Sequence, residues 1–194
     1  VTFEEEGIDY GVVDFGGNES MIVADPEDAT NTVVQSTKTA GAMTWGGTTL
    51  TSSVPSAPAG FVSQIPFAAD ATKMSVRVWS PTAGTPILLK VESKDDPTIS
   101  VETLTNTTVA GGWDVLVFDF STEEPGTAAL DIGRVYDKAS VFFNFGTMPT
   151  EAATYYWDDV FFVDGPGGDD SQMDLPVTFE EEGIDYGVVD FGGN

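Results

Sequence analysis

Acidic side chains stand at two places in this sequence where they could bind a cation. The segment TYYWDDVFFVD places Asp158 and Asp159 side by side in an otherwise apolar run, and three glutamates from Glu4 onward follow the start VTF. Buried carboxylates are costly unless they are paired or bound to a metal. If the two segments are adjacent strands, their oxygens suit Ca²⁺. A second interpretation keeps these charges exposed at a sheet edge, where they prevent pairing with other chains.

Alternation along three further segments separates an apolar face from a polar one. Segments 74–79, 87–92 and 141–145 carry apolar side chains at every second position. The predicted inward set is Met74, Val76, Val78, Ile87, Leu89, Val91, Val141, Phe143 and Phe145. If these segments are neighbours, one outer face carries Trp79, Arg77, Lys90, Glu92 and Asn144. A flat ring beside planar hydrogen-bonding groups is what a sugar requires. Alternatively, the tryptophan is core and Arg77 pairs with Glu92 across strands.

The elements that would position these residues are strands. Short runs rich in Val, Ile, Thr, Phe and Tyr are separated by Gly, Pro, Asn and Asp, and no segment keeps a helical period. Strands are predicted at 1–4, 21–24, 32–38, 42–45, 48–51, 61–67, 73–80, 86–93, 98–104, 113–120, 139–145 and 154–163. We therefore predict an all-β fold, a two-sheet antiparallel β-sandwich of the jelly-roll kind.

Composition excludes several classes of function. The sequence has 32 acidic and 7 basic residues and a net charge of −25, which repels phosphate backbones and anionic lipids, so no nucleic acid and no membrane is predicted as a partner. This charge is typical of a protein in a salty, calcium-containing exterior such as seawater. Alternatively, it serves only to keep the protein soluble. Histidine and cysteine are absent from the sequence, which excludes His-based triads and thiol chemistry. With so many acids, no carboxylate pair is marked out as a glycosidase acid and base.

A long repeat predicts the domain organisation. Residues 177–194 repeat residues 1–18 letter for letter, so the period is 177 − 1 = 176 residues. Solenoid units are much shorter, so a period of this length indicates a whole domain. We predict a module at 1–164, a flexible acidic linker at 165–176 and the start of the next tandem copy at 177–194. A tandem array would add avidity to weak single sites. The copy from residue 177 could also replace the first strand of another molecule, with an unstructured tail as the alternative.

Six short segments give a family resemblance. VTFEE, STKTAGAMTWGG and YYWDDVFF resemble the β-jelly-roll carbohydrate-binding modules found beside secreted bacterial glycanases such as xylanases, including the xylan- and β-glucan-binding groups. LLKVES, AGGWDVLVFDFS and VFFNFG are similar to modules of marine laminarinase-like glycanases. The resemblance implies a structural Ca²⁺ held by the carbonyl of Thr2, by Glu4, by a carbonyl near Lys38, and by Asp158 or Asp159. It also implies that Trp45 lines a glycan groove, whereas Trp113 and Trp157 are predicted to be core residues.

These observations predict a non-catalytic, calcium-containing module that binds a β-glucan-like polysaccharide. Its predicted binding residues are Trp45, Trp79, Arg77, Glu92 and Asn144, and it is expected in a secreted or cell-surface protein of a marine bacterium. One alternative is a calcium-stiffened structural or adhesin repeat without a ligand, which would bury both Trp45 and Trp79. The second alternative, a glycan hydrolase or lyase, would need a deep cleft with close carboxylates.

Overall fold

The computed structural model describes residues 1–4, 10–52, 60–61 and 63–163. Ten strands lie in this part of the chain. They are β1 (Tyr10–Phe15), β2 (Asn18–Ala24), β3 (Thr32–Lys38), β4 (Gly47–Ser52), β5 (Lys73–Ser80), β6 (Pro86–Glu92), β7 (Ser100–Asn106), β8 (Gly112–Asp119), β9 (Lys138–Phe143) and β10 (Ala153–Phe162). The predicted linker and repeat copy, 165–194, lie outside the described residues.

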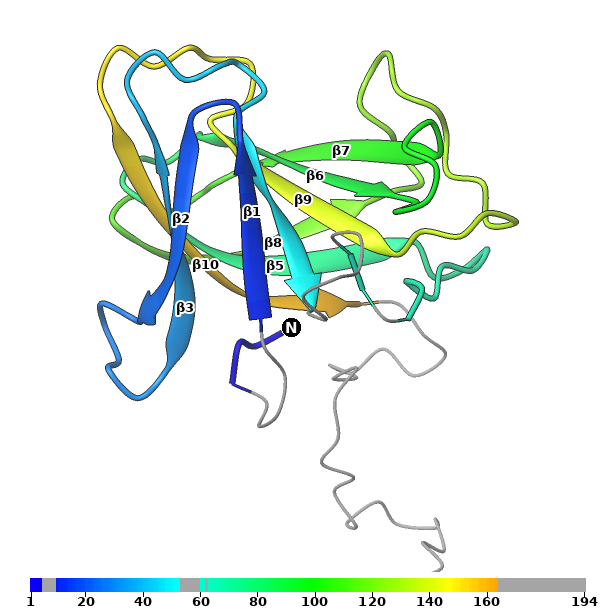
Figure 1. Cartoon of the computed structure of the whole chain (residues 1–194), viewed down its shortest axis with the longest axis horizontal. Helices are drawn as coiled ribbons and strands as arrows, with labels where there is room; N and C mark the ends of the chain where they lie inside the picture. Colours follow the sequence, from blue (N-terminus) through cyan, green and yellow to red (C-terminus); the bar gives the residue numbers. More distant parts are fainter. Residues whose placement is uncertain (5–9, 53–59, 62, 164–194) are drawn as a thin grey trace, which may run out of the picture.

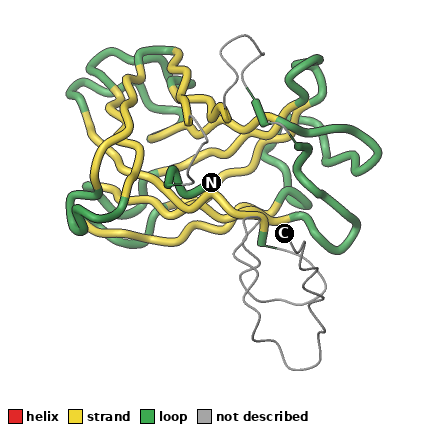
Figure 2. The backbone as a smooth tube through the Cα atoms, turned by 60° about the horizontal axis from the view of Figure 1, so that its bottom comes forward, coloured by secondary structure: helices red, strands yellow, loops and turns green. Residues whose placement is uncertain are grey.

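The strands form two antiparallel sheets of five. One sheet has the order β1-β4-β9-β6-β7, and the other has the order β2-β3-β10-β5-β8. The two sheets form stacked layers joined by loops (Figures 1 and 2). The predicted all-β sandwich of the jelly-roll kind is therefore confirmed. Within the described ranges, no helix is long and apolar enough to span a membrane.

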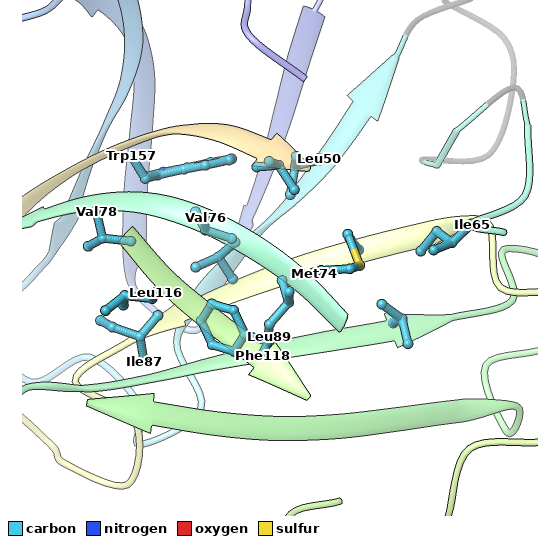
Figure 3. Packing of buried hydrophobic residues seen from close by; sticks show 14 of the residues in the cluster. Leu50, Ile65, Met74, Val76, Val78, Ile87, Leu89, Leu116, Phe118 and Trp157 are labelled. Carbon is cyan, nitrogen blue, oxygen red and sulfur yellow. The ribbon is translucent and has the colours of Figure 1, made fainter. Parts of the chain in front are cut away.

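The core lies between the two layers. Side chains from both sheets point toward one another there, with Val76 and Val78 of β5 near Ile87 and Leu89 of β6 (Figure 3). The apolar positions predicted to face inward on β5, β6 and β9 are buried in this core. Trp157 of β10 is fully buried, as predicted, and donates its indole N–H to Ser36 Oγ at 3.0 Å.

Three predicted strands are wrong and one strand was missed. Segments 1–4 and 42–45 form no strand, and neither do the described residues of 61–67. The first segment still lies beside β10, because the N–H and carbonyl of Val160 bond to Val1. The missed strand is β1, which a tight turn at Gly16 and Gly17 joins to β2. Both glycines have positive φ, 65° and 86°, a conformation that glycine adopts without strain.

Candidate functional site

A groove lies on the outer face of the sheet that contains β1, β4, β9, β6 and β7. It has a volume of about 460 Å³. It is lined by Phe15, Trp45, Thr49, Lys90, Glu92, Glu102, Lys138, Ser140, Phe142 and Phe145. The pairing register explains how they meet. Ser140 of β9 lies opposite both Thr49 of β4 and Lys90 of β6, and Lys90 lies opposite Glu102 of β7.

Aromatic rings form one end of the groove. Trp45, in the loop between β3 and β4, is 49% exposed and stacks on Phe15 with ring centroids 6.2 Å apart and planes 19° apart. Phe142 meets Phe15 edge to face at 5.3 Å and Phe145 at 5.9 Å. Gly16 permits this arrangement, because a Cβ at this position would lie only 2.9 Å from the Trp45 ring. The result is a supported ring with an open face, next to further rings.

Charged side chains form the other end. Glu92 accepts from Lys90 at 2.9 Å and from Lys138, and Lys90 also lies 3.8 Å from Glu102. Burial alone would raise the pKa of Glu92, but the two ammonium groups outweigh it and hold that pKa below its usual range. Glu92 is therefore an ionised acceptor, and the lysines are fixed donors, in a groove whose charges are mutually compensated.

The structure brings together only part of the predicted binding set. Trp45 and Glu92 line the groove. Trp79 and Arg77 do not, because β5 belongs to the opposite sheet and is not a neighbour of β6. The predicted common face was therefore wrong, and so was the suggested pair between Arg77 and Glu92. Asn144 adopts φ 46° in the turn after β9 and is not among the groove residues.

Sequence reasoning missed most of the groove. Phe15 belongs to the strand that was not predicted. Phe142 was placed on the outward face by alternation, a signal that went unused, and Phe145 was wrongly placed in the core. Lys138 and Glu102 could not be identified without the strand register. It places Lys138 opposite Glu92 and Glu102 opposite Lys90.

Trp79 and Arg77 belong to the outer face of the second sheet. Trp79 meets Tyr156 edge to face at 5.6 Å. The Arg77 guanidinium lies over Trp113, 3.8 Å from the ring centroid, in a cation–π contact. Trp113 was predicted to be core, yet it pairs with Trp79 on this face and is half-buried. Arg77 also bonds to Asp25 at 3.3 Å and lies 3.8 Å from Asp158, so its charge is compensated.

Acidic residues gather beside Arg77 at the end of this face. A pocket there is lined by Glu4, Asp25, Asp28, Thr30, Asn31, Arg77 and Asp159. Asp158 is 1% exposed and its Oδ1 has no hydrogen-bond partner, while its Oδ2 accepts from Asn31 at 3.1 Å. Burial, the charge of Asp159 and the charge of Glu4 raise the pKa of Asp158 to about 7.

The calcium ligands implied by the resemblance assemble only in part. Glu4, Asp158 and Asp159 lie in one region, and the bond between Val160 and Val1 brings Thr2 close to it. Lys38 does not belong there. It pairs with Ala153, five residues before Asp158, which at strand spacing is about 17 Å away.

Hard oxygen donors and an unpartnered buried carboxylate oxygen fit Ca²⁺ chemically. Among the described residues, no group of three or more acidic side chains converges tightly enough to hold a metal. A site here would thus need carbonyl or amide oxygens as well.

Fold and groove together define the class: a jelly-roll β-sandwich with an aromatic groove on one sheet. No family model matches the chain, and no curated protein matches it. Similar solved structures include two modules from Clostridium thermocellum. The family 11 carbohydrate-binding module of the cellulosomal cellulase Lic26A-Cel5E is 15% identical, with 82% of this chain and 89% of that chain covered and a TM-score of 0.48. The family 30 module of Cel9D-Cel44B is 10% identical, with coverage of 82% and 93% and a TM-score of 0.48.

An exo-β-agarase is similar over 87% of this chain and 25% of its own, at 7% identity and a TM-score of 0.55. This last comparison supports the β-sandwich fold.

Proposed function

We propose that this chain is a non-catalytic polysaccharide-binding module and that the groove on the β1-β4-β9-β6-β7 sheet is its binding site. One observation carries the proposal: Trp45 presents a half-exposed ring, stacked on Phe15, beside fixed donors and acceptors. Aromatic faces bury the apolar faces of sugar rings, while charged side chains at the same site orient the hydroxyl groups. A repeat without a ligand would instead bury Trp45.

The charges of the groove favour a neutral glycan such as a β-glucan. Lys90 and Lys138 are compensated by Glu92 and Glu102, so neither of these two groove lysines is left over for a sulfate or uronate group. The chain as a whole carries a charge of −25, which repels an anionic polymer. We expect a single-site Kd of around 10 μM to 1 mM, strengthened by tandem copies in a secreted or cell-surface parent protein.

The electrostatics of the groove support binding rather than hydrolysis. A glycosidase needs one carboxylic acid whose pKa is raised so that it can protonate the leaving group. The two lysines lower the pKa of Glu92 instead, which makes it a poor proton donor at neutral pH.

Affinity electrophoresis across a panel of neutral and anionic polysaccharides tests the proposal. Wild-type protein should be retarded by at least one neutral β-glucan. Trp45→Ala should weaken that binding at least tenfold, which is about 1.4 kcal/mol or more. Trp79→Ala, on the other sheet, is the matched control and should bind like wild type. Retention that is lost in Trp79→Ala and kept in Trp45→Ala would refute the assignment of the groove.

Calcium is a second part of the proposal. Glu4 and one or both of Asp158 and Asp159 would hold the ion, which would neutralise carboxylates that now repel one another. Removing calcium with a chelator should therefore lower the melting temperature, and adding it back should restore the value. A melting temperature that is the same with and without the chelator would contradict this part and leave the glycan site untouched.

Strand exchange between copies stays a proposal in altered form. The first strand of the structure is β1, at Tyr10–Phe15, and not the predicted segment 1–4. The copy of the β1 sequence is residues 186–191. Sedimentation at several protein concentrations, with and without residues 177–194, tests the exchange. An association that persists after the deletion would argue against it.

A further inference from the structure

A buried lysine stands behind the aromatic end of the groove. Lys38, the last residue of β3, is fully buried. Its Nζ donates to three main-chain carbonyl oxygens, those of Phe143 at 3.0 Å, Asn144 at 3.0 Å and Thr44 at 3.3 Å. An ammonium has three N–H donors, so this geometry uses all of them.

The three carbonyls belong to two of the three segments that carry the rings of the groove, and the third segment is β1 with Phe15. Thr44 immediately precedes Trp45, and Phe143 and Asn144 lie between Phe142 and Phe145. One ammonium thus joins the Trp45 loop to the end of β9. The Gly146 N–H, which donates to the Thr44 carbonyl at 3.0 Å, joins the same two segments.

Burying a charged amine costs free energy, because the amine loses its hydration. Burial lowers the pKa of Lys38 to about 8, which still leaves the amine charged at pH 7. The acceptors are carbonyl oxygens, whose partial charges converge on one point and would repel one another without a cation. Hydrogen bonds from a charged donor are also stronger than neutral ones.

We propose that Lys38 is a positioning residue of the groove: its ammonium holds the Trp45 loop against the end of β9 and so sets the spacing between Trp45, Phe142 and Phe145. Lys38 does not touch the ligand. It acts through the loops, so its loss weakens binding by letting the rings move apart. This inference rests on the proposed function of the groove.

Chemical replacement of the side chain separates charge from shape. The sequence has no cysteine, so Lys38→Cys introduces a unique thiol. Alkylation in denaturant with 2-bromoethylamine, followed by refolding, restores an ammonium at nearly the length of lysine. Alkylation with 2-bromoethanol gives a neutral side chain of similar size. Lys73→Cys, in β5 and outside the groove, treated with the same reagents, is the matched control.

The expected result is a difference that follows the charge at residue 38 alone. The aminoethylated form should bind the β-glucan found in the panel within about threefold of wild type, and the hydroxyethylated form about tenfold or more weaker. The indole N–H signal of Trp45 in ¹⁵N NMR should show increased mobility in the neutral form only. Both forms at residue 73 should match wild type. Equal binding and equal Trp45 signals for the two forms at residue 38 would overturn the proposal.

A measurement on the unaltered protein keeps the proposal testable if the neutral form does not refold. The Lys38 Nζ protons should exchange slowly with water, unlike those of the other lysines, and should show couplings to the carbonyl carbons of Thr44, Phe143 and Asn144. Fast exchange without such couplings would overturn the proposal. If wild-type protein binds no polysaccharide, the proposed function fails. The Nζ and Trp45 signals still decide whether Lys38 holds the Trp45 loop against the end of β9.

Discussion

The buried carboxylate of Asp158 makes a quantitative prediction about pH. Its pKa is raised from the ordinary value of 3.8 to about 7, first by burial, then by the charge of Asp159 and, more weakly, by that of Glu4. A raised carboxyl pKa means that the folded state binds the proton more tightly than the unfolded chain does. Stability therefore falls as pH rises between the two values. Each unit of difference corresponds to about 1.4 kcal/mol.

The magnitude follows from that shift. Between pH 5 and pH 7.5, without a divalent cation, Asp158 should lower the free energy of unfolding by on the order of 2 to 3 kcal/mol. Urea unfolding in a chelating buffer at several pH values measures this difference. Asp158→Asn removes the titration of Asp158 while it keeps a group that can meet Asn31, so the variant should lose most of that pH dependence. The remainder belongs to Asp159, whose pKa burial also raises. Added Ca²⁺ should remove most of it from wild type, because the ion favours the ionised form.

One control variant makes the test decisive. Asp25→Asn changes a carboxylate in the same region whose pKa is lowered, where burial is outweighed by bonds from Glu27, Asn31 and Arg77. Its loss should not flatten the dependence between pH 5 and 7.5. If wild type and Asp158→Asn lose stability in parallel over this range, the buried carboxylate is not the titrating group and the argument is wrong.

The remaining predictions concern the groove. Glu92→Gln should cost about 2 kcal/mol at pH 7, since it leaves two lysines without their shared partner. This cost should shrink below pH 4.5, where Glu92 of the wild type begins to take up protons on unfolding; urea unfolding at pH 7 and pH 3.5 measures both. Gly16→Ala should displace the Trp45 ring and weaken glycan binding severalfold, because φ is 65° at this position and a Cβ would clash with the ring. Gly126→Ala is the control for backbone strain, because Gly126 has φ 100° but a Cβ there would lie in open space. Phe142→Ala should weaken binding more than Phe67→Ala, which removes three aromatic contacts outside the groove. Equal losses would argue for a general loss of stability.

Much of the fold could be predicted from local pattern. Alternation placed Met74, Val76 and Val78 on the buried face of β5, because side chains of a strand point to opposite faces in strict turn. The same pattern failed where backbone geometry departs from a regular strand. Segment 42–45 is a turn that carries Trp45, and β1 was missed because its apolar residues are interrupted by Gly11 and Asp14.

The functional site could be predicted less well. Trp45 and Glu92 were placed in the binding set, and both line the groove. Trp79 and Arg77 were added because β5 was assumed to neighbour β6. A sequence shows which face of a strand a residue occupies, but it does not show which strands become neighbours.

The sequence by itself determined the all-β class, the inward and outward positions within most strands, the excess of negative charge and the long repeat. These follow from the two-residue period of strands and from residue counts, which need no knowledge of distant contacts. Only the tertiary structure decided that β6 lies beside β9 rather than β5, that Lys138 meets Glu92 and that Lys38 binds carbonyls more than a hundred residues away. Those pairings arise from the packing of the whole chain, because strand order and register are set by contacts between segments far apart in sequence.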